Sequence, residues 1–142
     1  MANLLAVTTD PAVIAAARAA ADALGVGLMQ VRSAGEGLAL ALRGGTDLVL
    51  IDAELPLMDA TALAYALDDP EGGLLIPTIA LARPGEDWRT MLDAGVGAVV
   101  ARPVAPGALR LAIQRMLPPD EPFRGGARMR WIIFFPDATI AT

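Results

Sequence analysis

The sequence predicts a doubly wound α/β domain built on a five-stranded parallel sheet. Short apolar segments alternate with amphipathic helical segments over residues 1–117. One of these segments, Leu48-Val49-Leu50-Ile51, is apolar without interruption, as is typical of a parallel strand covered on both faces. Alternating strands and helices joined by short links favour right-handed crossovers, so we expect helices on both faces of the sheet.

The first elements are defined by their ends. An apolar strand over residues 3–7 leads to Asp10 and Pro11, which suit the N-cap and first turn of a helix that Gly25 ends. A strand over 26–31 follows. Ser33 and Glu36 then form a capping box, and the helix that they open ends at the glycine pair 44–45. The third strand covers 47–52.

The remaining elements repeat the pattern. We expect a helix over residues 60–68, a buried strand over 76–81 and a short helix over 86–94 that Gly95 closes. A fifth strand covers 98–101. The last helix begins at Pro106 and aligns apolar residues at helical spacing, namely Leu109, Ala112, Ile113, Met116 and Leu117.

Composition excludes many kinds of site. The 142 residues contain no histidine, cysteine or lysine and a single serine, and all eleven basic residues are arginines. Zinc sites of cysteine and histidine, Schiff-base lysines and a Ser/His/Asp triad are therefore excluded. The net charge of −5 disfavours nucleic acid as a partner. No run is long and apolar enough to span a bilayer and the start lacks a secretory signal, so we expect a cytoplasmic protein without a membrane partner.

Residues 118–142 differ in composition and form a C-terminal extension to the domain at 1–117. The extension contains every phenylalanine of the chain and one of its two tryptophans. The candidate interaction residues in it are Trp131, Ile133, Phe134 and Phe135. A strand-like segment over 129–135 would add to a sheet edge, dock on its own domain or pair with another copy. The alternative is a chain end or the start of a further domain.

Three ordered stretches resemble the receiver (CheY-like) domain of bacterial two-component response regulators. The strongest is DLVLIDAELPLMDA at 47–60, and the others are AGVGA at 94–98 leading to Arg102-Pro103 and the last helix after its proline. The resemblance covers residues 3–117. It implies a flavodoxin-like fold, a role in phosphorelay signalling rather than an enzyme activity, and Asp52 at the phosphoacceptor position.

The other positions of that family's site are substituted. By the resemblance, Thr8 and Thr9 stand in place of paired acids and Arg102 in place of a lysine. Ala82 and Val99 replace the hydroxyl and the aromatic residue of the family's switch. Because Mg²⁺ needs oxygen ligands and is usually held by carboxylates, Asp52 with neutral neighbours predicts a poor magnesium site.

Arg102 is not equivalent to a lysine, because its planar guanidinium favours pairing with a carboxylate, here Asp52 or Glu54. Such a pair would hold the domain in one state. Asp10 and Asp52 are weak candidates for metal ligands, but Asp10 before Pro11 is better explained as a helix cap. Thr8 and Thr9 are expected to bind backbone groups rather than a new ligand.

We therefore predict a degenerate receiver that signals through a protein partner, either an effector or a histidine kinase, or as a homodimer through the last helix and the extension. No cofactor is expected in this case. The first alternative is a receiver that a histidine kinase phosphorylates at Asp52, with Mg²⁺ held through Asp10 or Glu54. The second alternative is a flavodoxin-like domain that binds a small molecule at the strand ends.

Overall fold

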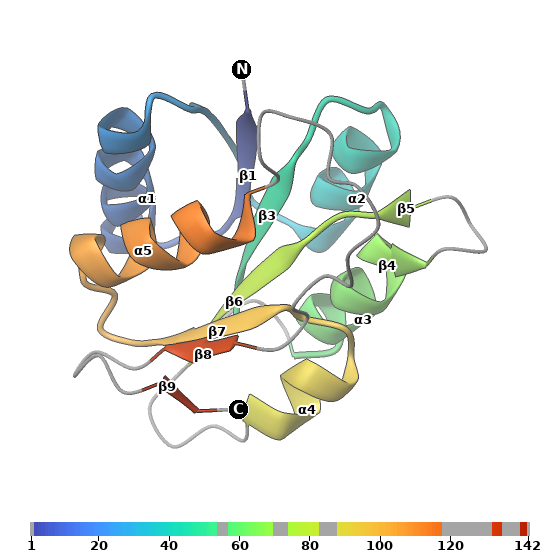
Figure 1. The fold of residues 1–142 in the computed structure, drawn as a ribbon. Helices are drawn as coiled ribbons and strands as arrows, with labels where there is room; N and C mark the ends of the chain where they lie inside the picture. Colours follow the sequence, from blue (N-terminus) through green and yellow to red (C-terminus); the bar gives the residue numbers. More distant parts are fainter. Residues whose placement is uncertain are drawn as a thin grey trace, which may run out of the picture.

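The computed structural model describes residues 2–53, 57–69, 74–82, 88–117, 132–134 and 140–141. Strands and helices alternate along most of this chain (Figure 1). The strands are β1 (Asn3–Val7), β2 (Gly27–Val31), β3 (Leu48–Asp52), β4 (Asp68–Asp69), β5 (Leu74–Leu75), β6 (Thr78–Ala82), β7 (Ala98–Ala101), β8 (Ile132–Phe134) and β9 (Ile140–Ala141). The helices are α1 (Pro11–Leu24), α2 (Ala34–Leu42), α3 (Leu57–Leu67), α4 (Trp88–Asp93) and α5 (Pro106–Met116).

The main sheet has the order β2-β1-β3-β6-β7-β8-β9 within the described residues. All pairs from β2 to β8 are parallel, and β9 is antiparallel to β8. The first five strands in this order confirm the predicted five-stranded doubly wound sheet. Because the carboxyl ends of β1, β3, β6 and β7 lie at one edge of this sheet, the residues that follow these strands are brought together.

Side-chain caps fix where the first two helices begin. Oδ1 of Asp10 accepts a hydrogen bond from the Ala12 amide at 2.9 Å, and Oγ of Ser33 accepts one from the Glu36 amide at 3.2 Å. Gly25, with φ +69°, ends α1 in the left-handed conformation that favours glycine. The caps predicted from the sequence are therefore confirmed.

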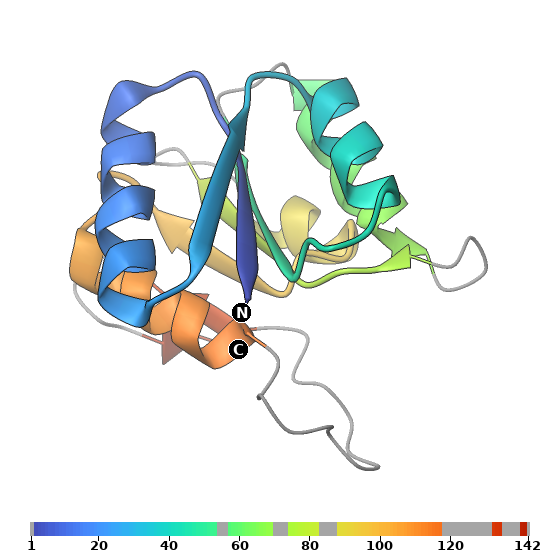
Figure 2. The ribbon, with the colours of Figure 1, turned by 90° about the horizontal axis from the view of Figure 1, so that it is seen from above.

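Two apolar clusters lie on opposite faces of the sheet. In β1, Leu4 and Ala6 belong to the cluster under α1 and α5, whereas Leu5 and Val7 belong to the cluster under α2, α3 and α4. Figure 2, seen from above, shows α1 and α5 on one side of the sheet and α2 and α3 on the other. The alternation follows from the two-residue period of a strand.

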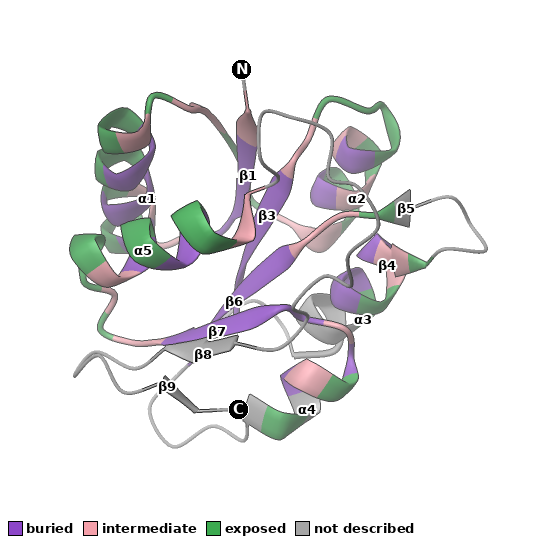
Figure 3. Cartoon of the chain, in the orientation of Figure 1, coloured by how far each residue is buried: buried purple, intermediate pink, exposed green. Residues whose placement is uncertain are grey.

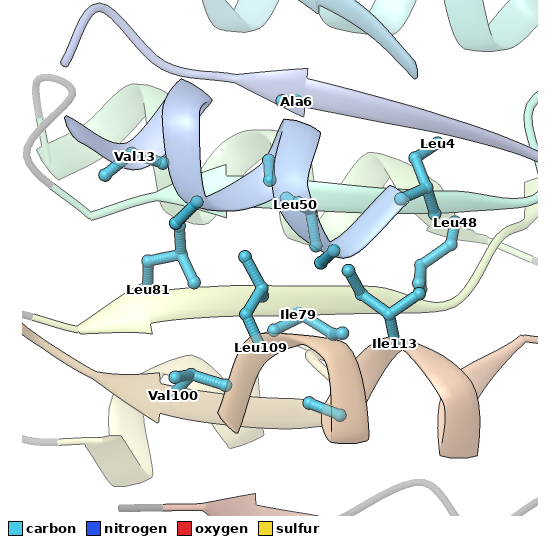
Figure 4. Packing of buried hydrophobic residues seen from close by; sticks show 14 of the residues in the cluster. Leu4, Ala6, Val13, Leu48, Leu50, Ile79, Leu81, Val100, Leu109 and Ile113 are labelled. Atoms are coloured by element: carbon cyan, nitrogen blue, oxygen red, sulfur yellow. The ribbon is translucent and has the colours of Figure 1, made fainter. Parts of the chain in front are cut away.

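Strands β3 and β6 are buried along their whole length, and β1 and β7 are buried except for one end residue each. Figure 3 shows buried residues along β1, β3, β6 and β7 and exposed residues on the outer sides of α1 and α5. In the first cluster, Leu109 and Ile113 of α5 point towards the sheet, where Ile79 lies (Figure 4). Burying a leucine or isoleucine side chain contributes about 1.5–3 kcal/mol, so these contacts fix α5, and the loop before it, against the sheet.

The structure departs from the sequence prediction at several boundaries. The strand expected from residue 76 begins at Thr78, because Pro77 has no amide hydrogen to donate and only its carbonyl joins the ladder, accepting from Val49 at 3.0 Å. The short antiparallel pair β4–β5 was not predicted. Helix α3 begins at Leu57 rather than at residue 60. None of the helices in the described ranges is long and apolar enough to cross a membrane.

Candidate functional site

The residues of the candidate site lie just beyond the carboxyl ends of β1, β3 and β7. Thr8 follows β1, and its amide continues the sheet ladder by donating to the Val31 carbonyl at 3.0 Å. Asp52 is the last residue of β3 and is paired in register with Leu81 of β6. Arg102 follows β7, and its amide donates to the Ala82 carbonyl at 2.9 Å. Backbone bonds to neighbouring strands thus hold all three residues in place.

A single carboxylate oxygen is the centre of the site. Oδ2 of Asp52 accepts a hydrogen bond from the Thr8 hydroxyl at 2.6 Å and one from Nη2 of Arg102 at 3.0 Å. Asp52 is 2% exposed and Thr8 is 1% exposed. A buried carboxylate is costly unless it is paired and hydrogen-bonded, and here the charge of Arg102 and the Thr8 hydroxyl both stabilise it.

Arg102 also contacts a second carboxylate. Its Nη2 atom lies 3.2 Å from Oδ2 of Asp10, while the Arg102 side chain is 9% exposed and that of Asp10 is 34% exposed. The expected contact with Asp52 is present, and the contact with Asp10 adds a partner that the sequence did not indicate. We define the strand-end site as Thr8, Asp10, Asp52 and Arg102.

Thr8 connects the two acids through its hydroxyl. Its Oγ1 atom donates to Asp52 and accepts from the Asp10 amide at 3.0 Å. The other carboxylate oxygen of Asp10, Oδ1, caps α1, so this residue is both a helix cap and an ion-pair partner. Thr9, the neighbouring candidate, is exposed.

The remaining sequence candidates have different surroundings. Ala82 and Val99 are buried, 5% and 1% exposed, in the cluster under α2, α3 and α4. Glu54, Trp131 and Phe135 lie outside the described residues. Ile133 and Phe134 lie in β8, for which the structure describes the backbone pairing.

One residue of this region was missed in the sequence. Nε2 of Gln30 donates to the Thr8 carbonyl at 3.1 Å from the adjacent strand β2. The register that pairs Ala6 with Gln30 brings this amide next to the end of β1. The sequence signal that could have indicated Gln30 was a polar residue near the end of the predicted strand over 26–31, next to the strand that leads to Thr8.

The donor set does not fit Mg²⁺, the ion that the receiver resemblance implies. Magnesium requires near-octahedral oxygen ligands at 2.0–2.1 Å and is usually held by carboxylates. In this structure Oδ2 of Asp52 and Oδ2 of Asp10 both face a guanidinium cation, and Thr8 supplies a neutral hydroxyl that already donates to Asp52. A divalent ion at these oxygens would lie next to the positive charge of Arg102. No group of three acidic, histidine or cysteine side chains that could hold a metal occurs within the described ranges.

Comparisons with solved structures identify the kind of domain that this fold resembles. The receiver domain of the sensor histidine kinase PA1611 of Pseudomonas aeruginosa PAO1, solved with magnesium in its active-site cleft, matches with a TM-score of 0.70 and 26% identity, covering 81% of this chain and 96% of that one. A CheY-like receiver domain protein of Methanospirillum hungatei JF-1 matches with a TM-score of 0.68 and 27% identity, covering 80% and 91%.

A third match was solved as a complex. The receiver domain of the Saccharomyces cerevisiae response regulator Ssk1, bound to the histidine phosphotransfer protein Ypd1, has a TM-score of 0.71 and 19% identity, covering 81% of this chain and 88% of that one. No protein-family model matches the sequence. No curated protein matches it either.

Proposed function

We propose that this chain, a receiver-type domain of two-component signalling, is a degenerate receiver that acts by binding a protein partner without being phosphorylated. The fold and the structural neighbours support the signalling role. The observation that carries the degenerate variant is the position of Arg102, whose Nη2 atom lies 3.0 Å from Oδ2 of Asp52. This oxygen belongs to the carboxylate that would otherwise attack a phosphoryl donor.

The charges at the strand-end site support the same proposal. A phosphoryl group brings about −1.5 to −2 charges, and its transfer depends on cations that neutralise them. The guanidinium of Arg102 is already shared between Asp10 and Asp52. For the phosphoryl group to be neutralised by Arg102, both ion pairs would have to weaken while a new charge entered a buried position.

The two pairs resist such a rearrangement to different degrees. At 3.0 Å and an effective dielectric constant near 20, the Coulomb attraction of Arg102 and Asp52 is about 5 kcal/mol before desolvation. Removing one member of a buried pair typically costs about 3–5 kcal/mol. The pair with Asp10 is weaker because the Asp10 side chain is 34% exposed. The Arg102–Asp52 contact would therefore hold the strand-end site in one state.

A protein partner is consistent with the receiver-type fold of this chain. The structure of Ssk1 with Ypd1 is of a receiver bound to another signalling protein. We propose that this chain likewise binds a signalling protein, an effector or a histidine kinase, in an interaction that does not require a phosphoryl group on Asp52. No enzyme activity is part of this role.

Phosphorylation with a small-molecule donor tests the proposal. The full chain is incubated with acetyl phosphate and Mg²⁺, and intact mass spectrometry measures whether a phosphoryl group is added. We expect no adduct on the native chain. The variant Thr8→Asp/Thr9→Asp/Arg102→Lys, which restores the acids and lysine that the resemblance implies, should gain an adduct that Asp52→Asn removes in the same background.

The alternative function is that of a phosphoacceptor receiver, and two observations favour it. Asp52 lies at the carboxyl end of the central strand β3, as the resemblance requires, and the neighbour from Pseudomonas aeruginosa contains magnesium in its cleft. A magnesium-dependent adduct on the native chain that is lost in Asp52→Asn would replace our proposal with this one.

A further inference from the structure

The C-terminal segment covers the sheet edge formed by β7. Strand β8 pairs with β7 in parallel, with Ala98 opposite Ile132, Val99 opposite Ile133 and Val100 opposite Phe134. Strand β9 then pairs with β8 in the antiparallel sense. The edge of the five-stranded core therefore receives a strand from residues that follow α5 (Figure 1).

The connection from β7 to β8 has an unusual hand. From β2 to β3, from β3 to β6 and from β6 to β7, the chain moves in one direction across the sheet, through α2, α3 and α4 on one face. The step from β7 to β8 continues in this direction but passes through α5, which lies on the opposite face with α1. Its hand is therefore opposite to that of the core connections.

This hand is strongly disfavoured within one chain. Connections between parallel strands of one sheet are right-handed in about 98% of cases, because a right-twisted strand that continues into a helix packs back onto the sheet only in that way. The rule follows from the covalent connection between the two strands. It does not restrict a pair of strands that belong to different chains.

The edge of β7 that faces away from β6 can accept a further strand. Strand β6 pairs with one side of the backbone of Ala98, Val99 and Val100, and β8 pairs with the other side. An uncovered edge presents unpaired amide and carbonyl groups, which favour pairing with another chain. The register of β7 with β8 shows that the segment containing Ile132–Phe134 fits this edge in the parallel sense.

We propose that two copies of this chain exchange their C-terminal segments, so that β8 and β9 of each copy complete the sheet of the other at β7. The pairing keeps its parallel register, and the disfavoured connection is removed because β7 and β8 then belong to different chains. The 14 residues from 118 to 131 can span at most roughly 45–50 Å, which sets the upper limit for the connection between the two copies. The exchange is isologous, since each copy gives and receives the same segment. This inference concerns the sheet edge and does not depend on the state of Asp52.

Engineered cysteines distinguish exchange from pairing within one chain, because the native sequence contains no cysteine. Val99 and Ile133 are opposite each other in neighbouring strands, which lie about 4.8 Å apart, within the range that a disulfide spans. Full-length Val99→Cys and Ile133→Cys chains, one of them carrying a size tag, are mixed, unfolded in urea, refolded together and oxidised. Exchange predicts a disulfide that joins one chain of each kind. The mismatched mixture of Ala105→Cys with Ile133→Cys should give none.

The double variant Val99→Cys/Ile133→Cys provides the second arm. Exchange predicts a product of two linked chains on a non-reducing gel, whereas pairing within a chain predicts a monomer with an internal disulfide. Light scattering on the native full chain should give the mass of a dimer. The variant Ile133→Pro, which removes an amide of β8, should give the mass of a monomer. The control variant Gly126→Pro, outside β8 and β9, should remain a dimer. A monomeric native chain together with an internal disulfide in the double variant would overturn the proposal.

Discussion

Asp10 and Asp52 face the same nitrogen atom, since Nη2 of Arg102 lies 3.2 Å from Oδ2 of the first and 3.0 Å from Oδ2 of the second. The two acids differ in burial, because the Asp10 side chain is 34% exposed and that of Asp52 is 2% exposed. The same cation thus takes part in one partly solvated pair and one buried pair. This difference makes the contributions of the two pairs separable by mutation.

Removing Arg102 should destabilise the fold mainly through Asp52. We expect Arg102→Met to lower the free energy of unfolding by about 3–5 kcal/mol, because it removes the cation that pairs with a buried carboxylate. Asp10→Asn keeps a good N-cap residue and should cost less than about 1 kcal/mol. Urea unfolding of the single and double variants gives the coupling energies. A coupling of Arg102 to Asp10 as large as that to Asp52 would contradict the assigned roles.

The Thr8 hydroxyl should contribute more to stability than the hydroxyl of the neighbouring Thr9. Thr8→Val keeps the side-chain shape but removes a hydrogen bond to an ionised carboxylate, so it should cost about 1.5–3 kcal/mol in urea unfolding. The matched control is Thr9→Val at the adjacent exposed position, which should change stability by less than about 0.5 kcal/mol. Equal effects of the two changes would show that the contact with Asp52 has no net energetic role.

Substitution of Thr78 should change the free energy of unfolding in the opposite direction. Its Oγ1 atom is buried and makes no hydrogen bond among the described residues, and the residue is 1% exposed. Thr78→Val should therefore leave stability unchanged or raise it by up to about 1 kcal/mol, because the apolar methyl group needs no hydrogen-bond partner. Thermal unfolding measures the change. A clear loss of stability would mean that the hydroxyl has a partner in solution, such as a buried water.

Gly95 should not tolerate a side chain. Its φ is +101°, and a Cβ atom would lie 2.6 Å from Oδ2 and 2.8 Å from Cβ of Asp68. Gly95→Ala should therefore lower the free energy of unfolding by at least about 1 kcal/mol. Gly107→Ala is the control, because nothing lies within 4 Å of its added Cβ in α5, and alanine there should raise stability by about 0.5–1 kcal/mol. A neutral Gly95→Ala would contradict the close approach of Asp68.

The regular part of the fold was predictable because local signals and periodicity agreed. Asp10, Pro11 and Gly25 marked both ends of α1, and the unbroken apolar run before Asp52 marked the central strand β3. The hairpin of β4 and β5 was missed, since each strand has only two residues and carries no periodic pattern. The β8–β7 pairing depends on long-range contacts, so the sequence could suggest a strand but not its position in the sheet.

The candidate site was predictable in its members but not in its geometry. Arg102 and Asp52 were expected to pair because each follows or ends a parallel strand on the same edge of the sheet. The contact of Arg102 with Asp10 joins residues that are 92 positions apart, and no local pattern indicates it. Gln30 was missed because its role, a hydrogen bond to the Thr8 carbonyl, depends on the register of β2 with β1.

The most direct test of the central claim is an NMR titration of the full chain with Mg²⁺ and then beryllofluoride, an analogue of the phosphoryl group on aspartate. Because Arg102 and Thr8 already bind Oδ2 of Asp52, and both ligands would need the Asp52 carboxylate, we predict no shift of the amides of Thr8, Asp52 or Arg102 at millimolar Mg²⁺, with or without beryllofluoride. Saturable shifts at Asp52 that spread into β7 would contradict the account and establish Asp52 as a phosphoacceptor.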